Sequence, residues 1–160
     1  MRINTYVTEL DQCRFPYLAK ERGSNYKATD EFTNPQAIVR MINELFHADR
    51  KAEEYAWIVA FDTKMHPLGV FELSHGCVNG SIVNPREIFI RLCLCGASCF
   101  VLIHNHPAGV TRPSLEDSRV TERISHAGNL MGIPLRDHII VGSGSYYSFM
   151  AEGTMPKPAA

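Results

Sequence analysis

The stretch "FVLIHNHPAGVTRPSLED", residues 100–117, carries the pattern that decides the fold. Its apolar run, Phe100 to Ile103, predicts a strand buried in a sheet, and a loop of prolines and glycine then leads to Ser114, a residue suited to begin a helix. Buried strands and helices alternate along the rest of the chain too, which predicts an α/β domain with helices packed on a mixed sheet. A strand and a turn alone do not explain why the run ends in two histidines at alternate positions.

Two asparagine–proline pairs mark the starts of two further helices. Asn34 caps and Pro35 opens a helix whose apolar residues recur at intervals of three and four. Asn84 and Pro85 repeat this signal, and Gly96 ends the second helix. Between them, "EEYAWIVAF" and "LGVFELS" predict two strands joined by a turn, and "PLRDHIIVG" and "YYSFM" predict two last strands.

The length of 160 residues suits one domain with a sizeable core. We place that domain at residues 34–150, where the helix and strand patterns are strong. Residues 1–33 are weakly patterned and are expected to form an irregular N-terminal segment. Residues 151–160 are expected to form a flexible tail.

Composition narrows the classes of partner and compartment. With 16 basic and 17 acidic residues, the chain carries no strong nucleic-acid signature. The five cysteines are odd in number, which favours free thiols in a reducing cytoplasm over a secreted disulfide framework. No apolar run approaches the roughly 18 residues of a membrane span. We therefore expect a cytoplasmic protein without a membrane partner, and the pattern leaves the oligomeric state open.

The two histidines and the helix that follows them predict a metal site. Alternate residues of a strand point to one side, about 6.6 Å apart along it, so His104 and His106 can aim at one point. Asp117 lies in the first turn of the next helix, where it can face back toward the strand end. Two imidazoles and one carboxylate leave a tetrahedral Zn²⁺ ion with an open fourth position, which is the layout of a catalytic zinc site.

An ordinary explanation also exists for each of these residues. Ser114 and Asp117 form an S-x-x-D capping pattern that stabilises a helix start by itself. His104 can be a hydrogen-bonded core histidine, and His106 a turn residue before proline. The metal site is favoured because these explanations require several coincidences within 14 residues. The two interpretations also coexist, since a capping serine places its hydroxyl beside the metal.

The segment "HNHPAGVTRPSLED" resembles the JAMM signature, H-x-H-(x)n-S-x-x-D, of the JAB/MPN-domain zinc hydrolases. "NGSIVNPREIF" and "LMGIPLRDHIIVGSGSYYSF" are similar to the RadC-like branch of that family, so the resemblance covers most of the chain. It implies a cytidine-deaminase-like α/β architecture and one Zn²⁺ ion per chain, held by His104, His106 and Asp117. It also implies peptidase or isopeptidase activity.

The resemblance further implies a glutamate, upstream of the histidine pair, that acts as a general base. Glu54, at the start of the segment "EYAWIVAF", takes that position. A slip of one residue to Glu53 would point the side chain to the opposite face. Glu72, the carboxylate within "LGVFELS", is the alternative base.

Three other residues receive roles from the same resemblance. Ser114 would donate a hydrogen bond to the oxyanion that forms on the substrate. Asp137 and His138 match the "DHII" of the family pattern. They either orient the metal ligands or are strand residues satisfied by neighbouring backbone.

These residues predict a zinc-dependent hydrolase that attacks a peptide or isopeptide bond with a metal-activated water, on a peptide or protein substrate. The alternative is a non-catalytic metal-binding interaction module associated with DNA repair or DNA-processing proteins. Longer RadC-like chains carry a helix–hairpin–helix region associated with DNA, but residues 1–33 are too short and too weakly patterned for it. A nucleobase deaminase would need H-x-E followed by P-C-x-x-C, whereas this chain has H-x-H.

Overall fold

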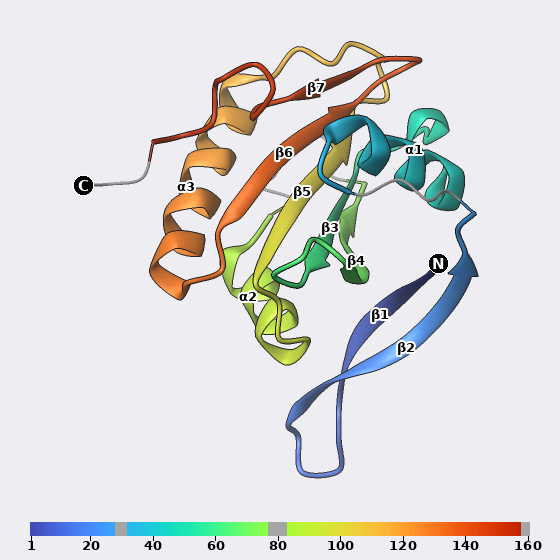
Figure 1. The fold of residues 1–160 in the computed structure, drawn as a ribbon, viewed down its shortest axis with the longest axis vertical. Coiled ribbons are helices and arrows are strands. Elements are labelled where there is room, and N and C mark those ends of the chain that lie inside the picture. The colour runs from blue at the N-terminus through green and yellow to red at the C-terminus, as the bar shows by residue number, and fades with distance from the viewer. Residues whose placement is uncertain (28–31, 77–82, 158–160) are drawn as a thin grey trace.

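The computed structural model describes residues 1–27, 32–76 and 83–157. These residues form one mixed sheet and three α-helices, which confirms the predicted α/β class (Figure 1). In chain order the elements are β1 (Arg2–Leu10), β2 (Pro16–Asn25), α1 (Pro35–Phe46), the 3₁₀ helix η1 (Ala48–Arg50), β3 (Tyr55–Phe61), β4 (Pro67–His75), α2 (Pro85–Leu94), β5 (Cys99–Asn105), α3 (Leu115–Met131), β6 (Leu135–Val141) and β7 (Tyr146–Ser148).

Strands β3 and β5 lie at the centre of the sheet, whose order is β2-β1-β4-β3-β5-β6-β7. Their almost continuous apolar sequences suit this place because both faces of the sheet are covered. Helix α1 packs on one face with Trp57, and helices α2 and α3 pack on the other with Ile58. Figure 1 shows these two helical layers on opposite sides of the strands. We call the two sides the α1 face and the α2–α3 face.

The alternation of side chains along β5 decides which face receives the histidines. Val101 and Ile103 belong to the core of the α1 face, whereas Phe100 and Leu102 belong to that of the α2–α3 face. Successive strand residues point to opposite faces, so His104 follows Leu102 onto the α2–α3 face.

Strands β5 and β6 pair in parallel, with His104 opposite Ile140, and α3 connects them. Their carboxyl ends therefore share one edge of the sheet, which is where α/β sheets commonly bind ligands. Helix α3 begins close to that edge with Ser114 as its N-cap and ends at Gly132, whose φ of 69° suits glycine. Among the described residues, every helix is too short or too polar to cross a bilayer.

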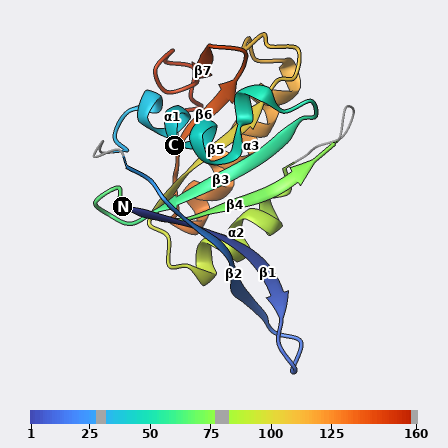
Figure 2. The ribbon, with the colours of Figure 1, turned by 90° about the vertical axis from the view of Figure 1, so that its right-hand side faces the viewer.

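The prediction of an irregular segment for residues 1–33 is wrong where the structure describes them. Strands β1 and β2 form an antiparallel hairpin, and β1 joins the sheet by a parallel pairing of Thr5 with Val70. The hairpin extends beyond the rest of the sheet (Figure 2). Most of β2, "PYLAKERGSN", is exposed or half-buried, so it lacks the alternation of apolar residues by which a strand is predicted.

The chain after β7 is a hydrogen-bonded turn rather than the expected flexible tail. The backbone N–H of Glu152 donates to Ser148 at 3.0 Å, and that of Thr154 donates to Phe149 at 2.8 Å. The tail prediction also covered residues 158–160, which lie outside the described residues. These hydrogen bonds extend the ordered domain a few residues beyond the predicted boundary at residue 150.

Candidate metal centre

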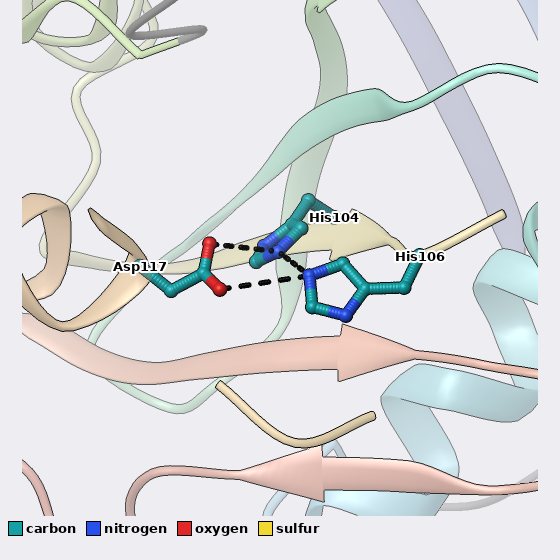
Figure 3. A group of neighbouring side chains, drawn as sticks. All are labelled: His104, His106 and Asp117. Carbon is teal, nitrogen blue, oxygen red and sulfur yellow. Dashed lines mark hydrogen bonds and ion pairs between the residues drawn. The ribbon is translucent and has the colours of Figure 1, made fainter. Parts of the chain in front are cut away.

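His104, His106 and Asp117 converge at the carboxyl end of β5 (Figure 3). His104 is the penultimate residue of β5, His106 follows the strand, and Asp117 lies in the first turn of α3. The two Nε2 atoms of the histidines are 3.0 Å apart. Asp117 Oδ1 lies 3.2 Å from Nε2 of His104, and its Oδ2 lies 3.5 Å from Nε2 of His106. Strand alternation and the helix start therefore bring the three side chains together as predicted.

These separations, in which each oxygen of Asp117 faces one histidine, are close to those between the ligand atoms of a tetrahedral zinc ion. Ligand atoms about 2.0–2.1 Å from zinc at tetrahedral angles lie about 3.3 Å from one another. The observed separations of 3.0, 3.2 and 3.5 Å bracket that value. The side chain of His104 is 6% exposed, whereas those of His106 and Asp117 are 19% and 14% exposed. The group is thus buried on one side and reaches solvent on the other.

The hydrogen bond on the far nitrogen of His106 orients its ring toward the site. Nδ1 of His106 lies 2.7 Å from the carbonyl oxygen of Val110. A carbonyl oxygen only accepts, so Nδ1 must carry the proton and donate. In the neutral ring, Nε2 then presents its lone pair to His104 and Asp117. Lone pairs that converge in this way favour a bound cation.

Charge within the group shifts two pKa values in opposite directions. Burial alone would raise the pKa of Asp117, but its contacts with the imidazoles of His104 and His106 outweigh burial and hold that pKa well below its usual range. The hydrogen bond with Asp117 raises the pKa of His106. The carboxylate is therefore ionised at neutral pH, as a metal ligand must be.

Ser114 forms both halves of a capping box with Asp117. The serine Oγ accepts from the backbone N–H of Asp117 at 3.1 Å, and Asp117 Oδ2 accepts from the serine backbone at 2.7 Å. The serine hydroxyl also donates to Oδ2 at 2.6 Å. The helix-capping interpretation is therefore confirmed, and the same contacts hold the hydroxyl against a ligand carboxylate. The role of Ser114 as an oxyanion donor stays a prediction.

Glu54 lies immediately before β3 and is half-buried. Ala56 pairs with His104 across β3 and β5, so these two side chains point to one face. Glu54 would share that face if the alternation of β3 continued two residues further, and its role as the general base stays a prediction. The charge of Glu54 is the smallest contribution to the raised pKa of His106, after the hydrogen bond with Asp117.

Glu72 lies on the opposite face of the sheet. It pairs with Trp57, a residue of the α1-face core, and its side chain is exposed. Its Oε1 is 3.2 Å from Nδ1 of His75. The alternative base is therefore separated from the histidine pair by the thickness of the sheet.

A family model described as the RadC-like JAB domain matches residues 32–154. The chain belongs to this family. Among its relatives is a "UPF0758 protein" of Pelobacter propionicus, 36% identical over 143 residues that make up 88% of this chain and 61% of the relative. Another, of Geotalea uraniireducens, is 38% identical over 139 residues, 86% of this chain and 60% of the relative.

A third "UPF0758 protein", of Alkaliphilus metalliredigens, is 42% identical over 103 residues, 64% of this chain and 44% of the relative. The RadC-like chain thus spans about three fifths of the length of the first two relatives. The names of the relatives state no activity. What this RadC-like JAB domain does must therefore be argued from the site itself.

In this RadC-like JAB domain, Asp137 and His138 are divided between the two faces of β6. Nε2 of His138 lies 2.8 Å from Nδ1 of His104, so His138 contacts a ligand directly, and burial lowers its pKa well below the usual value. Asp137 instead accepts from the hydroxyl of Ser148 at 2.6 Å and from the backbone N–H of Met150 at 2.9 Å. Burial raises the pKa of Asp137. Asp137 therefore stabilises the end of β7 and the turn that follows it, and does not contact the histidine pair.

Sequence reasoning missed two buried residues beside the site. Asn105 lies between the two histidines and is 1% exposed. Its Oδ1 accepts from the backbone N–H of Tyr55 at 2.7 Å, and its Nδ2 donates to the carbonyl of Glu53 at 3.0 Å. Asn105 thereby fastens the segment that carries Glu54 to the end of β5. An amide inside an apolar strand was the available signal.

Thr121 is the second missed residue, and it is 1% exposed. It lies four residues after Asp117, so both point to the same side of α3. Its hydroxyl donates to the carbonyl oxygen of Asp117 at 2.6 Å and lies 2.7 Å from Nδ1 of His138. The spacing of four residues between Asp117 and Thr121, which puts both on one side of a helix, was the sequence signal for this residue.

Proposed function

We propose that this RadC-like JAB domain is a zinc-dependent hydrolase that cleaves peptide or isopeptide bonds. One observation carries the proposal. Two imidazole nitrogens and a carboxylate lie at the mutual distances of a tetrahedral zinc site, with protein on one side and solvent on the other. A zinc ion with three protein ligands leaves one coordination position for a water.

The donor set favours zinc over the hard cations. Imidazole suits zinc and other transition metals, whereas magnesium and calcium prefer oxygen ligands throughout. When bound by two histidines and a carboxylate, zinc supplies a Lewis acid and lowers the pKa of water at its open position to about 7. His104, His106 and Asp117 would hold the ion. Within the described residues, these three form the metal-binding group, so a fourth protein ligand does not close it.

Two residues of this chain would carry the proton and charge movements of amide hydrolysis. Glu54, which immediately precedes β3, would take the proton of the attacking water and return it to the leaving amine. Ser114 would turn its hydroxyl from Asp117 toward the oxygen of the attacked carbonyl. The exposed position of Ser114 permits this rotation at the open side of the site.

The alternative function is a metal-binding interaction module that docks on DNA-processing proteins. Such a module needs neither an open coordination position nor a carboxylate beside it. The open coordination position that three protein ligands would leave therefore favours the hydrolase.

Metal analysis followed by a cleavage screen tests the proposal. We expect about one zinc ion per purified chain, and cleavage of some members of a peptide and isopeptide library by the zinc-loaded protein but not by the chelator-treated protein. Bound zinc without cleavage across the library would support the interaction module. A purified chain that takes up no zinc would overturn both.

A further inference from the structure

A buried chain of contacts connects helix α3 to the ligand His104. It begins at the carbonyl oxygen of Asp117, which accepts from the hydroxyl of Thr121 at 2.6 Å. The same hydroxyl oxygen lies 2.7 Å from Nδ1 of His138. Nε2 of His138 then lies 2.8 Å from Nδ1 of His104. Thr121 and His138 are each 1% exposed, and His104 is 5% exposed.

The chemistry of these groups permits one direction of donation along the chain. A carbonyl oxygen only accepts, so the single hydroxyl proton of Thr121 goes to Asp117. The hydroxyl oxygen must then accept from His138, whose Nδ1 therefore carries a proton. In neutral His138, Nε2 is left as an acceptor, and it takes the proton donated by Nδ1 of His104. The remaining nitrogen of neutral His104, Nε2, is left with a lone pair and lies 3.0 Å from Nε2 of His106 and 3.2 Å from Oδ1 of Asp117.

We propose that Thr121 and His138 are positioning residues that set the tautomer of His104, so that its Nε2 is available as a metal ligand. This rests on the metal site of the proposed function but not on hydrolysis. If the threonine hydroxyl were lost, His138 could carry its proton on Nε2 and donate to His104. The His104 proton would then move to Nε2, where it would block the ligand position.

A flip of the His138 ring would also change which of its nitrogens faces His104, but the packing around the ring opposes such a flip. The imidazole stacks on Phe149 with ring centroids 5.0 Å apart and an angle of 5° between the planes. The backbone N–H of Phe149 also donates to the carbonyl of His138 at 3.0 Å. The ring orientation is therefore held by tertiary contacts, and Thr121 is left to decide the position of the proton.

The chain also ties two ligands together. The hydrogen bond to the carbonyl oxygen of Asp117 orients the hydroxyl of Thr121, and the carboxylate of the same Asp117 is itself a proposed ligand. A shift of the first turn of α3 would therefore move one ligand and disturb the tautomer of another. Outer partners of metal-bound histidines commonly contribute about 10- to 100-fold in metal affinity, and we expect Thr121 to act within that range.

The substitution Thr121→Val tests this order, because valine keeps the shape of threonine and removes the hydroxyl. We expect Thr121→Val to weaken zinc binding about 10- to 100-fold in competition with a chromophoric chelator. Thr121→Ser restores the hydroxyl and should bind zinc within about threefold of the unaltered chain. The control is Ser125→Ala, which removes another buried hydroxyl one turn further along α3 and should leave zinc affinity unchanged.

A spectroscopic measurement on the metal-free protein tests the tautomers directly. In ¹⁵N spectra of the imidazoles we expect the proton of His138 on Nδ1, and we expect it to leave that position in Thr121→Val. A proton on Nε2 of His138 in the unaltered chain, or zinc affinity unchanged by Thr121→Val, would overturn the inference. If the unaltered chain binds no zinc, the proposed function fails, while the tautomers of the metal-free protein still decide the order of donation.

Discussion

Two histidine–carboxylate pairs lie on opposite faces of the sheet with the same separation. Nε2 of His104 is 3.2 Å from Asp117, and Nδ1 of His75 is 3.2 Å from Glu72. The side chains of the first pair are 6% and 14% exposed, and those of the second are 58% and 45% exposed. The second pair is a solvated surface contact of a kind that contributes little to stability. Distance alone therefore does not make a site.

The first pair differs because it is buried and because a third donor joins it. His106 adds a second imidazole nitrogen 3.0 Å from that of His104. Removing polar groups from water is costly unless a cation or hydrogen bonds compensate, so a partly buried group of donors is a stronger candidate for a metal site than an exposed pair. The four predictions that follow test this contrast between the two faces, beginning with the largest expected effect.

Replacing a histidine of each pair should separate the two faces by metal content. We expect His104→Gln to reduce bound zinc from about one ion per chain to near zero, because the site loses one of three protein ligands. His75→Gln should retain the full metal content. Elemental analysis of both purified variants measures this, with circular dichroism to verify folding. Equal zinc in the two variants would place the ion elsewhere.

Replacing each of the two candidate bases should separate them by turnover. We expect Glu54→Gln to retain zinc and to lower the cleavage rate by about 10²–10⁴, because the general base is lost. Glu72→Gln should cleave at the rate of the unaltered chain. Initial rates on a substrate found by library screening measure the difference. A fully active Glu54→Gln variant would remove Glu54 from the proposed function.

Asp137 and His138 are adjacent in sequence but face opposite sides of the sheet, so a substitution of Asp137 should affect stability and not zinc affinity. We expect Asp137→Ala to lower the free energy of unfolding by about 2–3 kcal/mol, because Ser148 and Met150 lose a charged acceptor. Zinc affinity of the folded variant should stay the same. Urea unfolding and chelator competition measure the two quantities. A large loss of zinc affinity would show that Asp137 acts on the ligands after all.

The smallest effect is a pH dependence of the metal-free protein. Hydrogen bonding to Asp117 raises the pKa of His106, so its contribution to stability is complete below the ordinary value of 6.5 and is lost as the pH rises through the folded-state value. The pKa of Asp117 is lowered, so its contribution is complete above 3.8 and is lost as the pH falls. The pair should therefore stabilise the metal-free protein most between pH 3.8 and 6.5.

Urea unfolding of the metal-free chain and of His106→Gln measures this contribution. We expect the difference in unfolding free energy between the two to be larger at pH 5.5 than at pH 8.5. His75→Gln is the matched control and should change stability little at either pH, since its pair is exposed. A difference that is the same at both pH values would contradict the assigned interaction between His106 and Asp117.

The convergence of the three candidate ligands could be predicted from sequence because each position depends on local geometry. Strand alternation puts His104 and His106 on one side, and the capping box puts Asp117 in the first turn of its helix. The central strands could be predicted for a similar reason, since burial on both faces leaves a continuous apolar run. The hairpin of β1 and β2 could not, because most of β2 is exposed or half-buried and its pattern resembles a loop.

The sequence by itself determined the α/β class, the three predicted ligands and the starts of the helices, because these follow from periodicity and capping within a few residues. Only the tertiary structure decided that His138 rather than Asp137 reaches a ligand, and that Thr121 completes the contact. Those choices depend on the register of β6 against β5 and on the packing of α3 against β6. A register is a relation between distant segments, and it is set by the packing of the whole core.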